Sequence, residues 1–215
     1  MNEMVNVKEY LISLGYSNES IEKILGNNSL TNFKEDTLLI HIKNNYNFFI
    51  TFGYNHKDIL KMTKTLPTLY GYSIENIKQK IEDLISLGYS KSDVIKMTKL
   101  LPALYSLSIE NIKQKIEDLI SLGYSKSDVI KMTKTLPALY SLSIENIKQK
   151  IDDLISLGYS CEDVIKMTKT LPTLFGLSIE NIKQKIEDLI SLGYSKNDVI
   201  KMTKTLPTLF GLSIE

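Results

Sequence analysis

The chain of 215 residues contains no tryptophan, no arginine, a single cysteine and only two histidines. The one thiol, Cys161, excludes a disulfide scaffold and a zinc site built on several cysteines. Scarce histidine and cysteine also leave few side chains for a catalytic cluster or a metal site, and no serine–histidine–acid set or glycine-rich phosphate loop is visible. We therefore expect a protein without enzymatic activity, bound metal or cofactor.

Long apolar runs and an excess of charge of one sign are also missing. The longest apolar runs are short, as at Phe48–Phe52, and cannot span a bilayer. The 26 basic residues nearly cancel the 25 acidic ones, so the net charge of +1 does not by itself indicate a nucleic-acid partner. Because no signal, transit or membrane segment is visible, we predict a cytoplasmic protein with no membrane partner and no small-molecule substrate.

An internal repeat dominates the chain. Segments Ser86–Ile120 and Ser121–Ile155 differ at two of their 35 positions. A strict period of this length is typical of stacked supersecondary units, that is, of a solenoid. All five prolines and five of the glycines follow the same spacing: Pro67, Pro102, Pro137, Pro172, Pro207, and Gly53, Gly88, Gly123, Gly158, Gly193.

One repeat, read over residues 124–158, predicts two helices joined by a short helical turn. Ser125 is a favoured N-cap residue for a first helix over about residues 126–135. Pro137 suits the first position of a short helical turn, and Ser143 caps a second helix that ends near Gly158. We therefore predict an all-α superhelical solenoid of 35-residue helix–turn-helix–helix repeats, right- or left-handed.

The repeats are not uniform at the two ends of the chain. Residues 1–49 resemble a repeat in which GNNSLTNFKED replaces the proline turn, so we expect a degenerate N-terminal capping repeat. Residues 50–215 then form about five tandem repeats in one continuous solenoid. At Leu212–Glu215 the sequence has only begun another second helix, so we expect an uncapped end and a fragment of a longer protein.

The repeat resembles that of the mitochondrial transcription termination factor (mTERF) family. The residues that carry the resemblance are Leu122-Gly123-Tyr124-Ser125, Asp128-Val129, Lys131, Leu136-Pro137, Leu139-Tyr140, Leu142-Ser143-Ile144-Glu145-Asn146, Lys148 and Lys150. The resemblance covers residues 50–215 and, weakly, residues 8–49. It implies a left-handed superhelical solenoid that binds double-stranded DNA or RNA along a basic surface, and a role in transcription regulation.

TAL-effector repeats have a similar length, and their first helix resembles Tyr124–Val129. They read DNA through a variable residue pair beside a Gly-Gly loop. The matching pair here, Thr135-Leu136, hardly varies between repeats and is followed by proline rather than glycine. The base-by-base code of that family is therefore not predicted.

Two lysines on the exposed side of each first helix are the candidate nucleic-acid contacts. Such a ladder could follow a phosphate backbone, with affinity from counterion release. A solvated face is the competing interpretation, because an acid precedes the first lysine by three residues and the helix dipole favours cations at this end. The other alternative is a scaffold that binds protein partners through the same extended surface. The candidates are Lys61, Lys64, Lys96, Lys99, Lys131, Lys134, Lys166, Lys169, Lys201 and Lys204.

The remaining periodic residues are expected to build the core. Wheel arithmetic on the second helix groups Ile144, Ile147, Ile151, Leu154 and Ile155 on one packing stripe. The recurring tyrosines, phenylalanines and methionines are expected to seal the junctions between repeats rather than stack on bases.

Overall fold

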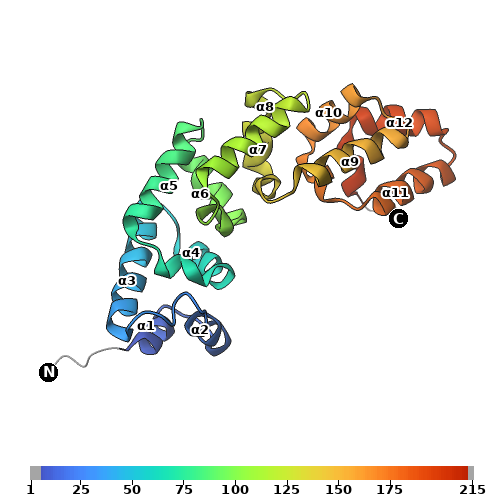
Figure 1. The fold of residues 1–215 in the computed structure, drawn as a ribbon. Helices are drawn as coiled ribbons and strands as arrows, with labels where there is room; N and C mark the ends of the chain where they lie inside the picture. Colours follow the sequence, from blue (N-terminus) through green and yellow to red (C-terminus); the bar gives the residue numbers. More distant parts are fainter. Residues whose placement is uncertain (1–5, 213–215) are drawn as a thin grey trace. The chain divides into compact units, whose positions relative to one another are not determined.

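The computed structural model describes residues 6–212. Within them the chain is entirely helical and contains no strand (Figure 1). Ser213–Glu215, where the sequence predicts the start of a further helix, lie outside the described residues. The α-helices and the short 3-10 helices (η) are α1 (Val7–Ser13), α2 (Asn18–Leu25), α3 (Glu35–Phe52), α4 (His56–Thr65), η1 (Pro67–Gly71), α5 (Ile74–Ser86), α6 (Lys91–Leu100), η2 (Pro102–Tyr105), α7 (Ile109–Ser121), α8 (Lys126–Thr135), η3 (Pro137–Tyr140), α9 (Ile144–Ser156), α10 (Cys161–Thr170), η4 (Pro172–Gly176), α11 (Ile179–Ser191), α12 (Lys196–Thr205) and η5 (Pro207–Gly211).

The predicted helix–turn-helix–helix repeat is confirmed. We call the first helix of a repeat helix A (α4, α6, α8, α10, α12) and the second helix B (α5, α7, α9, α11). The chain divides between Ile109 and Glu110 into two compact halves. In the N-terminal half α4 packs on α6, and in the C-terminal half α8 packs on α10 and α10 on α12. Helix B packs likewise on the next helix B, as α9 does on α11.

Local sequence signals fix the ends of these helices. The side chain of Ser125 accepts a hydrogen bond from the Asp128 amide, and the Asp128 carboxylate accepts one from the Ser125 amide, which completes a capping box. Pro137 opens η3, because its fixed φ and missing N–H suit the first position of a helix. Gly158 follows helix B at φ 112°, a left-handed conformation in which a side chain would be strained.

The buried stripe on helix B is narrower than the sequence predicts. Ile147, Ile151 and Leu154 are buried, as expected. Ile144 is only half-buried, and Ile155 is 38% exposed. At about 100° per residue both lie at one edge of the arc that faces the neighbouring helices. The same position is exposed on α3 and on the other B helices, which gives a set of partly exposed isoleucines: Ile50, Ile85, Ile120, Ile155 and Ile190.

The aromatic residues pack in the core, as the sequence predicts. Tyr124 and Tyr159, which follow the glycine that ends helix B, are buried, and so are Tyr140 and Phe175 of the proline turns. Tyr194, in the last repeat, is an exception at 46% exposed. The methionines of helix A are buried filler on the same side: Met62, Met97, Met132 and Met167.

Candidate nucleic-acid interface

The two lysines of each helix A lie in different surroundings. We call Lys61, Lys96, Lys131, Lys166 and Lys201 the outer lysine row, and Lys64, Lys99, Lys134, Lys169 and Lys204 the inner lysine row. All five lysines of the outer row are exposed to solvent. Inner-row lysines are partly shielded, with side chains about 38% exposed at Lys99 and Lys169. The sequence places both rows on the exposed side of helix A, and the structure separates them.

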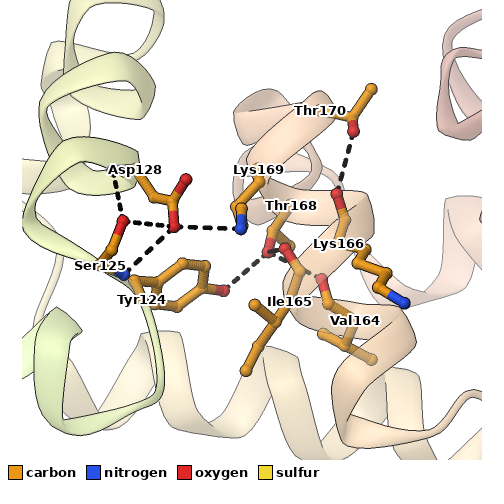
Figure 2. A network of polar contacts seen from close by, with 9 residues as sticks. All are labelled: Tyr124, Ser125, Asp128, Val164, Ile165, Lys166, Thr168, Lys169 and Thr170. Atoms are coloured by element: carbon orange, nitrogen blue, oxygen red, sulfur yellow. Dashed lines mark hydrogen bonds and ion pairs between the residues drawn. The ribbon is translucent and has the colours of Figure 1, made fainter.

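Inner-row lysines join successive repeats. The ammonium group of Lys169 on α10 lies 3.0 Å from a carboxylate oxygen of Asp128 on α8 (Figure 2). The equivalent distance is 3.4 Å from Lys204 to Asp163. In the N-terminal half, the Lys99 ammonium group lies 2.8 Å from the carboxylate of Asp58. Each of these lysines therefore pairs with the N-terminal acid of the preceding helix A.

The acid in this contact serves two elements at once. Figure 2 shows the Asp128 carboxylate accepting hydrogen bonds from the amide and hydroxyl of Ser125 and facing Lys169. The hydrogen bond from the Ser125 hydroxyl, aided by Lys169, lowers the pKa of Asp128. The Ser160 hydroxyl lowers the pKa of Asp163 in the same way. The ionised acid thus caps its own helix and holds the next repeat.

Outer-row lysines have no such partner on the next repeat. Lys166 forms an ion pair of 2.7 Å with Glu162 of its own helix, and this hydrogen bond raises the pKa of Lys166. In the other repeats the position of Glu162 is occupied by lysine, serine or asparagine. Within residues 6–212 the remaining lysines of the row form no ion pair: Lys61, Lys96, Lys131 and Lys201.

Helix B lysines of the Lys150 type are structural. The Lys150 ammonium group donates a hydrogen bond of 2.6 Å to the carbonyl of Leu177, just before the next helix B. Lys115 and Lys185 make the same contact with Leu142 and Leu212 at 2.6 and 2.5 Å. These lysines are held by backbone carbonyls and are poor candidates for ligand contacts.

A buried chain of hydroxyl groups crosses each of the repeat junctions in the N-terminal half. The Thr98 hydroxyl lies 2.7 Å from the Val94 carbonyl of its own helix and 2.5 Å from the hydroxyl of Tyr54. Because the Thr98 hydroxyl has one hydrogen, which it gives to the carbonyl, it accepts from Tyr54. Tyr54 in turn accepts from Tyr105 at 2.9 Å. The junction of Tyr16, Thr63 and Tyr70 repeats this order.

In the C-terminal half, the series of hydrogen-bonded hydroxyl groups is one member shorter. Tyr124 donates to Thr168 at 2.7 Å, and Thr168 donates to the Val164 carbonyl at 2.8 Å. Phe175 occupies the position of the second tyrosine. The hydroxyl of this second tyrosine, such as Tyr105, only donates within the series of hydroxyl groups. Replacing it with phenylalanine therefore leaves no hydrogen-bond donor of the series unsatisfied. Burial raises the pKa of Tyr124 to about 12.

The arrangement of repeats agrees with a family comparison. The model of the mTERF family matches residues 1–166 and 119–215, which together span the whole chain. The chain belongs to the mTERF family. No curated protein matches the chain closely enough to count as a relative. Family membership accounts for the all-helical repeat with its proline turn and leaves the roles of individual lysines to be argued from their contacts.

Two contacts between mTERF repeats of this chain were missed by reasoning from the sequence. The aspartate that pairs with Lys99, Lys169 or Lys204 lies 41 positions earlier in the sequence, a spacing that no local pattern reveals. The hydrogen bond of Thr168 could have been predicted from the sequence. Every helix A places a threonine on its buried side, and a buried hydroxyl needs a hydrogen-bond partner.

Other candidate sites in the described chain are poor. Residues 6–212 bring no group of three histidine, cysteine, aspartate or glutamate side chains together in a way that could hold a metal ion. Cys161 is exposed at the start of α10. Nor does any helix of this part of the chain combine the length and apolarity needed to cross a membrane.

Proposed function

We propose that this mTERF-family chain is a non-enzymatic protein that binds DNA or RNA through phosphate contacts of the outer lysine row. The observation that carries the proposal is the recurrence of an exposed ammonium group at one position of successive A helices, four of the five without an ion pair in the described chain. Membership of the mTERF family supports a nucleic-acid ligand. Lysine contacts of this kind bind the backbone electrostatically and release counterions.

The side chains of the row favour backbone binding over base reading. Lysine presents a compact charge on a flexible stem, whereas arginine provides the planar fork that pairs with guanine in the major groove. The chain has no arginine. We therefore expect weak sequence preference and an affinity that depends steeply on salt.

The inner row has a different part in this proposal. The ion pairs of Lys99, Lys169 and Lys204 join consecutive A helices, so they fix the register in which the outer lysines follow one another. An ammonium group already paired with a carboxylate gains less from a phosphate, because the existing pair must be broken first. We thus propose the outer row as the contact surface and the inner row as its support.

The test is a fluorescence-anisotropy titration with labelled single- and double-stranded DNA and RNA at two salt concentrations. The test variant carries glutamine at Lys61, Lys96, Lys131 and Lys201. The control variant carries glutamine at four lysines of helix B that are also exposed. Both variants change the net charge from +1 to −3, so a difference between them reports position rather than total charge. The control positions are Lys78, Lys113, Lys148 and Lys183.

We expect the outer-row variant to lose salt-dependent binding and the control variant to keep most of it. For duplex DNA the slope of log affinity against log salt should shrink by about 0.9 for each lost contact. Equal losses in the two variants would refute the outer row as the contact surface. Absence of binding to all four nucleic acids at low salt would refute the nucleic-acid proposal itself.

The second candidate function is a scaffold for protein partners. The observation that favours it is the set of partly exposed isoleucines on α3 and helix B, defined above, since repeated apolar side chains at one position offer a binding surface without charge. A protein partner bound there would be insensitive to the outer-row substitutions. Its binding would be lost on changing Ile120 and Ile155 to serine, and a pull-down with that variant as the control separates the two functions.

A further inference from the structure

The middle helix A of the C-terminal half differs in charge from its two neighbours. Helices α8 and α12 each carry three lysines and one acid, whereas α10 carries two lysines and two acids. Both differences lie in the first turn of α10. Cys161 stands where a lysine begins α8 and α12. Glu162 stands where α8 has Ser127 and α12 has Asn197. The two differences act in the same direction, because one removes a positive charge and the other adds a negative charge.

The added acid pairs with the outer-row lysine of its own helix. The Glu162 carboxylate lies 2.7 Å from the ammonium group of Lys166, four residues later. Figure 2 shows this ammonium group directed away from the contact between Lys169 and Asp128 that joins α10 to α8. Within residues 6–212 the equivalent lysines of α8 and α12 form no ion pair. The pair therefore changes the one side of α10 on which its neighbours present an open ammonium group.

The fold of α10 does not depend on this acid. Ser160 and Asp163 already form the capping box of the helix, as the equivalent residues do in α8. The side chain of Glu162 is 77% exposed and that of Lys166 is 65% exposed. An exposed ion pair within one helix adds little to stability. What Glu162 alters is therefore the charge that α10 presents to a ligand.

We propose that Glu162 keeps Lys166 from binding phosphate and so interrupts the outer lysine row at α10. The inference rests on the proposed function and names a repeat that does not engage the nucleic acid. A phosphate that binds the Lys166 ammonium group must break the existing pair. The phosphate and the carboxylate then lie within the screening length, about 8 Å at physiological salt, and repel each other. Nucleic acid is held instead by Lys131 and Lys201, on the two helices that pack against α10.

The test opens the interrupted row by changing one exposed residue. Glu162→Ser gives α10 the residue that α8 has at this position. Its affinity for the four labelled nucleic acids of the titration above is compared with that of the unchanged chain. For duplex DNA we expect tighter binding and a slope of log affinity against log salt that is steeper by about 0.9, so the gain should be about 3.5-fold larger at 50 mM than at 200 mM salt. Glu162→Gln should do the same, because it also removes the charge.

Two comparisons attribute the gain to Lys166 rather than to total charge. Glu187→Ser on α11 removes another exposed acid and raises the net charge equally, and it should give a smaller gain. Lys166→Gln should cost more affinity in the Glu162→Ser background than in the unchanged chain, by about threefold at low salt. The reciprocal variant Ser127→Glu should weaken binding by α8 and should reduce the further loss caused by Lys131→Gln.

Several results would overturn the inference and leave the proposed function intact. One is an equal gain from Glu162→Ser and Glu187→Ser, because total charge would then explain both. Another is a gain that Lys166→Gln does not reverse, and a third is binding by Glu162→Ser or Glu162→Gln no tighter than by the unchanged chain. In each case the variant with four outer-row glutamines should still lose binding. Absence of binding by the unchanged chain to all four nucleic acids would refute the proposed function, and this inference with it.

Discussion

Replacing Thr168 with valine should destabilise the C-terminal half more than replacing its partner Tyr124 with phenylalanine. Thr168 is fully buried and accepts a hydrogen bond of 2.7 Å from the Tyr124 hydroxyl. Valine keeps the shape of threonine and removes the acceptor, so the hydroxyl of Tyr124 stays buried with no partner. Stranding a buried polar group costs about 1–3 kcal/mol, which is the loss in unfolding free energy we expect for Thr168→Val.

Tyr124→Phe leaves a smaller deficit. The Thr168 hydroxyl keeps its own acceptor, the Val164 carbonyl at 2.8 Å, so its one donor remains satisfied. The loss is then that of an ordinary hydrogen bond, about 0.5–1.5 kcal/mol. The double variant removes donor and acceptor together and strands neither. We expect it to cost clearly less than the sum of the two single variants, with a favourable coupling energy between the two positions.

Urea unfolding followed by far-UV circular dichroism measures the three free energies. Because repeat arrays can unfold in parts, amide exchange within α10 serves as a local measurement of the same junction. A Thr168→Val variant that loses no more stability than Tyr124→Phe would refute the direction assigned to this hydrogen bond. Additive losses in the double variant would refute the contact itself.

Three further predictions concern the acids and phenols of the same junctions. Asp128→Ala should cost about 1–2 kcal/mol of unfolding free energy, because Asp128 both caps α8 and pairs with Lys169. Lys169→Met should cost only about 0.2–1 kcal/mol, because a partly exposed ion pair alone contributes little. Urea unfolding measures both free energies, and equal costs would contradict the dual role of Asp128. The pKa values of Asp128 and Asp163 are lowered in the folded state, so the stability they contribute is present above the unfolded pKa of about 3.9 and is lost as pH falls through the folded pKa. When both residues are changed to asparagine, the unfolding free energy measured against pH should fall less steeply in this acid range. The pKa of Tyr124 is raised to about 12, so the stability that its protonated hydroxyl contributes is present below the unfolded pKa of about 10 and is lost between pH 10 and 12. Tyr124→Phe should therefore reduce the loss of unfolding free energy between about pH 10 and 12. An unchanged loss would contradict the prediction.

The helices of this chain could be predicted because their signals are local. Ser125 and Asp128 lie three residues apart, Pro137 lies two residues after helix A, and Gly158 lies two residues after helix B, so each boundary is specified by nearby residues. Helix B ends at Ser156, two residues before the glycine near which the sequence predicts its end. The exposure of Ile155 could not be predicted, because it depends on how far the neighbouring helices reach around helix B.

The candidate site could be predicted only as a set of lysines. Helical spacing places Lys131 and Lys134 on the same side of helix A, and it contains no information on which of the two meets the neighbouring repeat. That choice depends on the register of stacking, which brings Asp128 to Lys169 across 41 residues. The acceptor of Lys150 was equally hidden, because it is the backbone carbonyl of Leu177 and carries no sequence signature.

Under the proposed function, the separation of the two rows explains how a chain with a net charge of +1 can bind phosphates through one row of lysines. In the inner row, Lys99, Lys169 and Lys204 each pair with an N-terminal aspartate of the preceding helix A, whereas four outer-row lysines form no ion pair within the described residues. Packed helices are about 8–10 Å apart, and the screening length at physiological salt is about 8 Å. Neighbouring outer lysines therefore repel one another little, and each can meet its own phosphate, since a nucleic-acid strand offers one roughly every 3.4 Å along the helix axis. Under the proposed function, affinity then grows stepwise with the number of repeats engaged rather than residing in any single repeat.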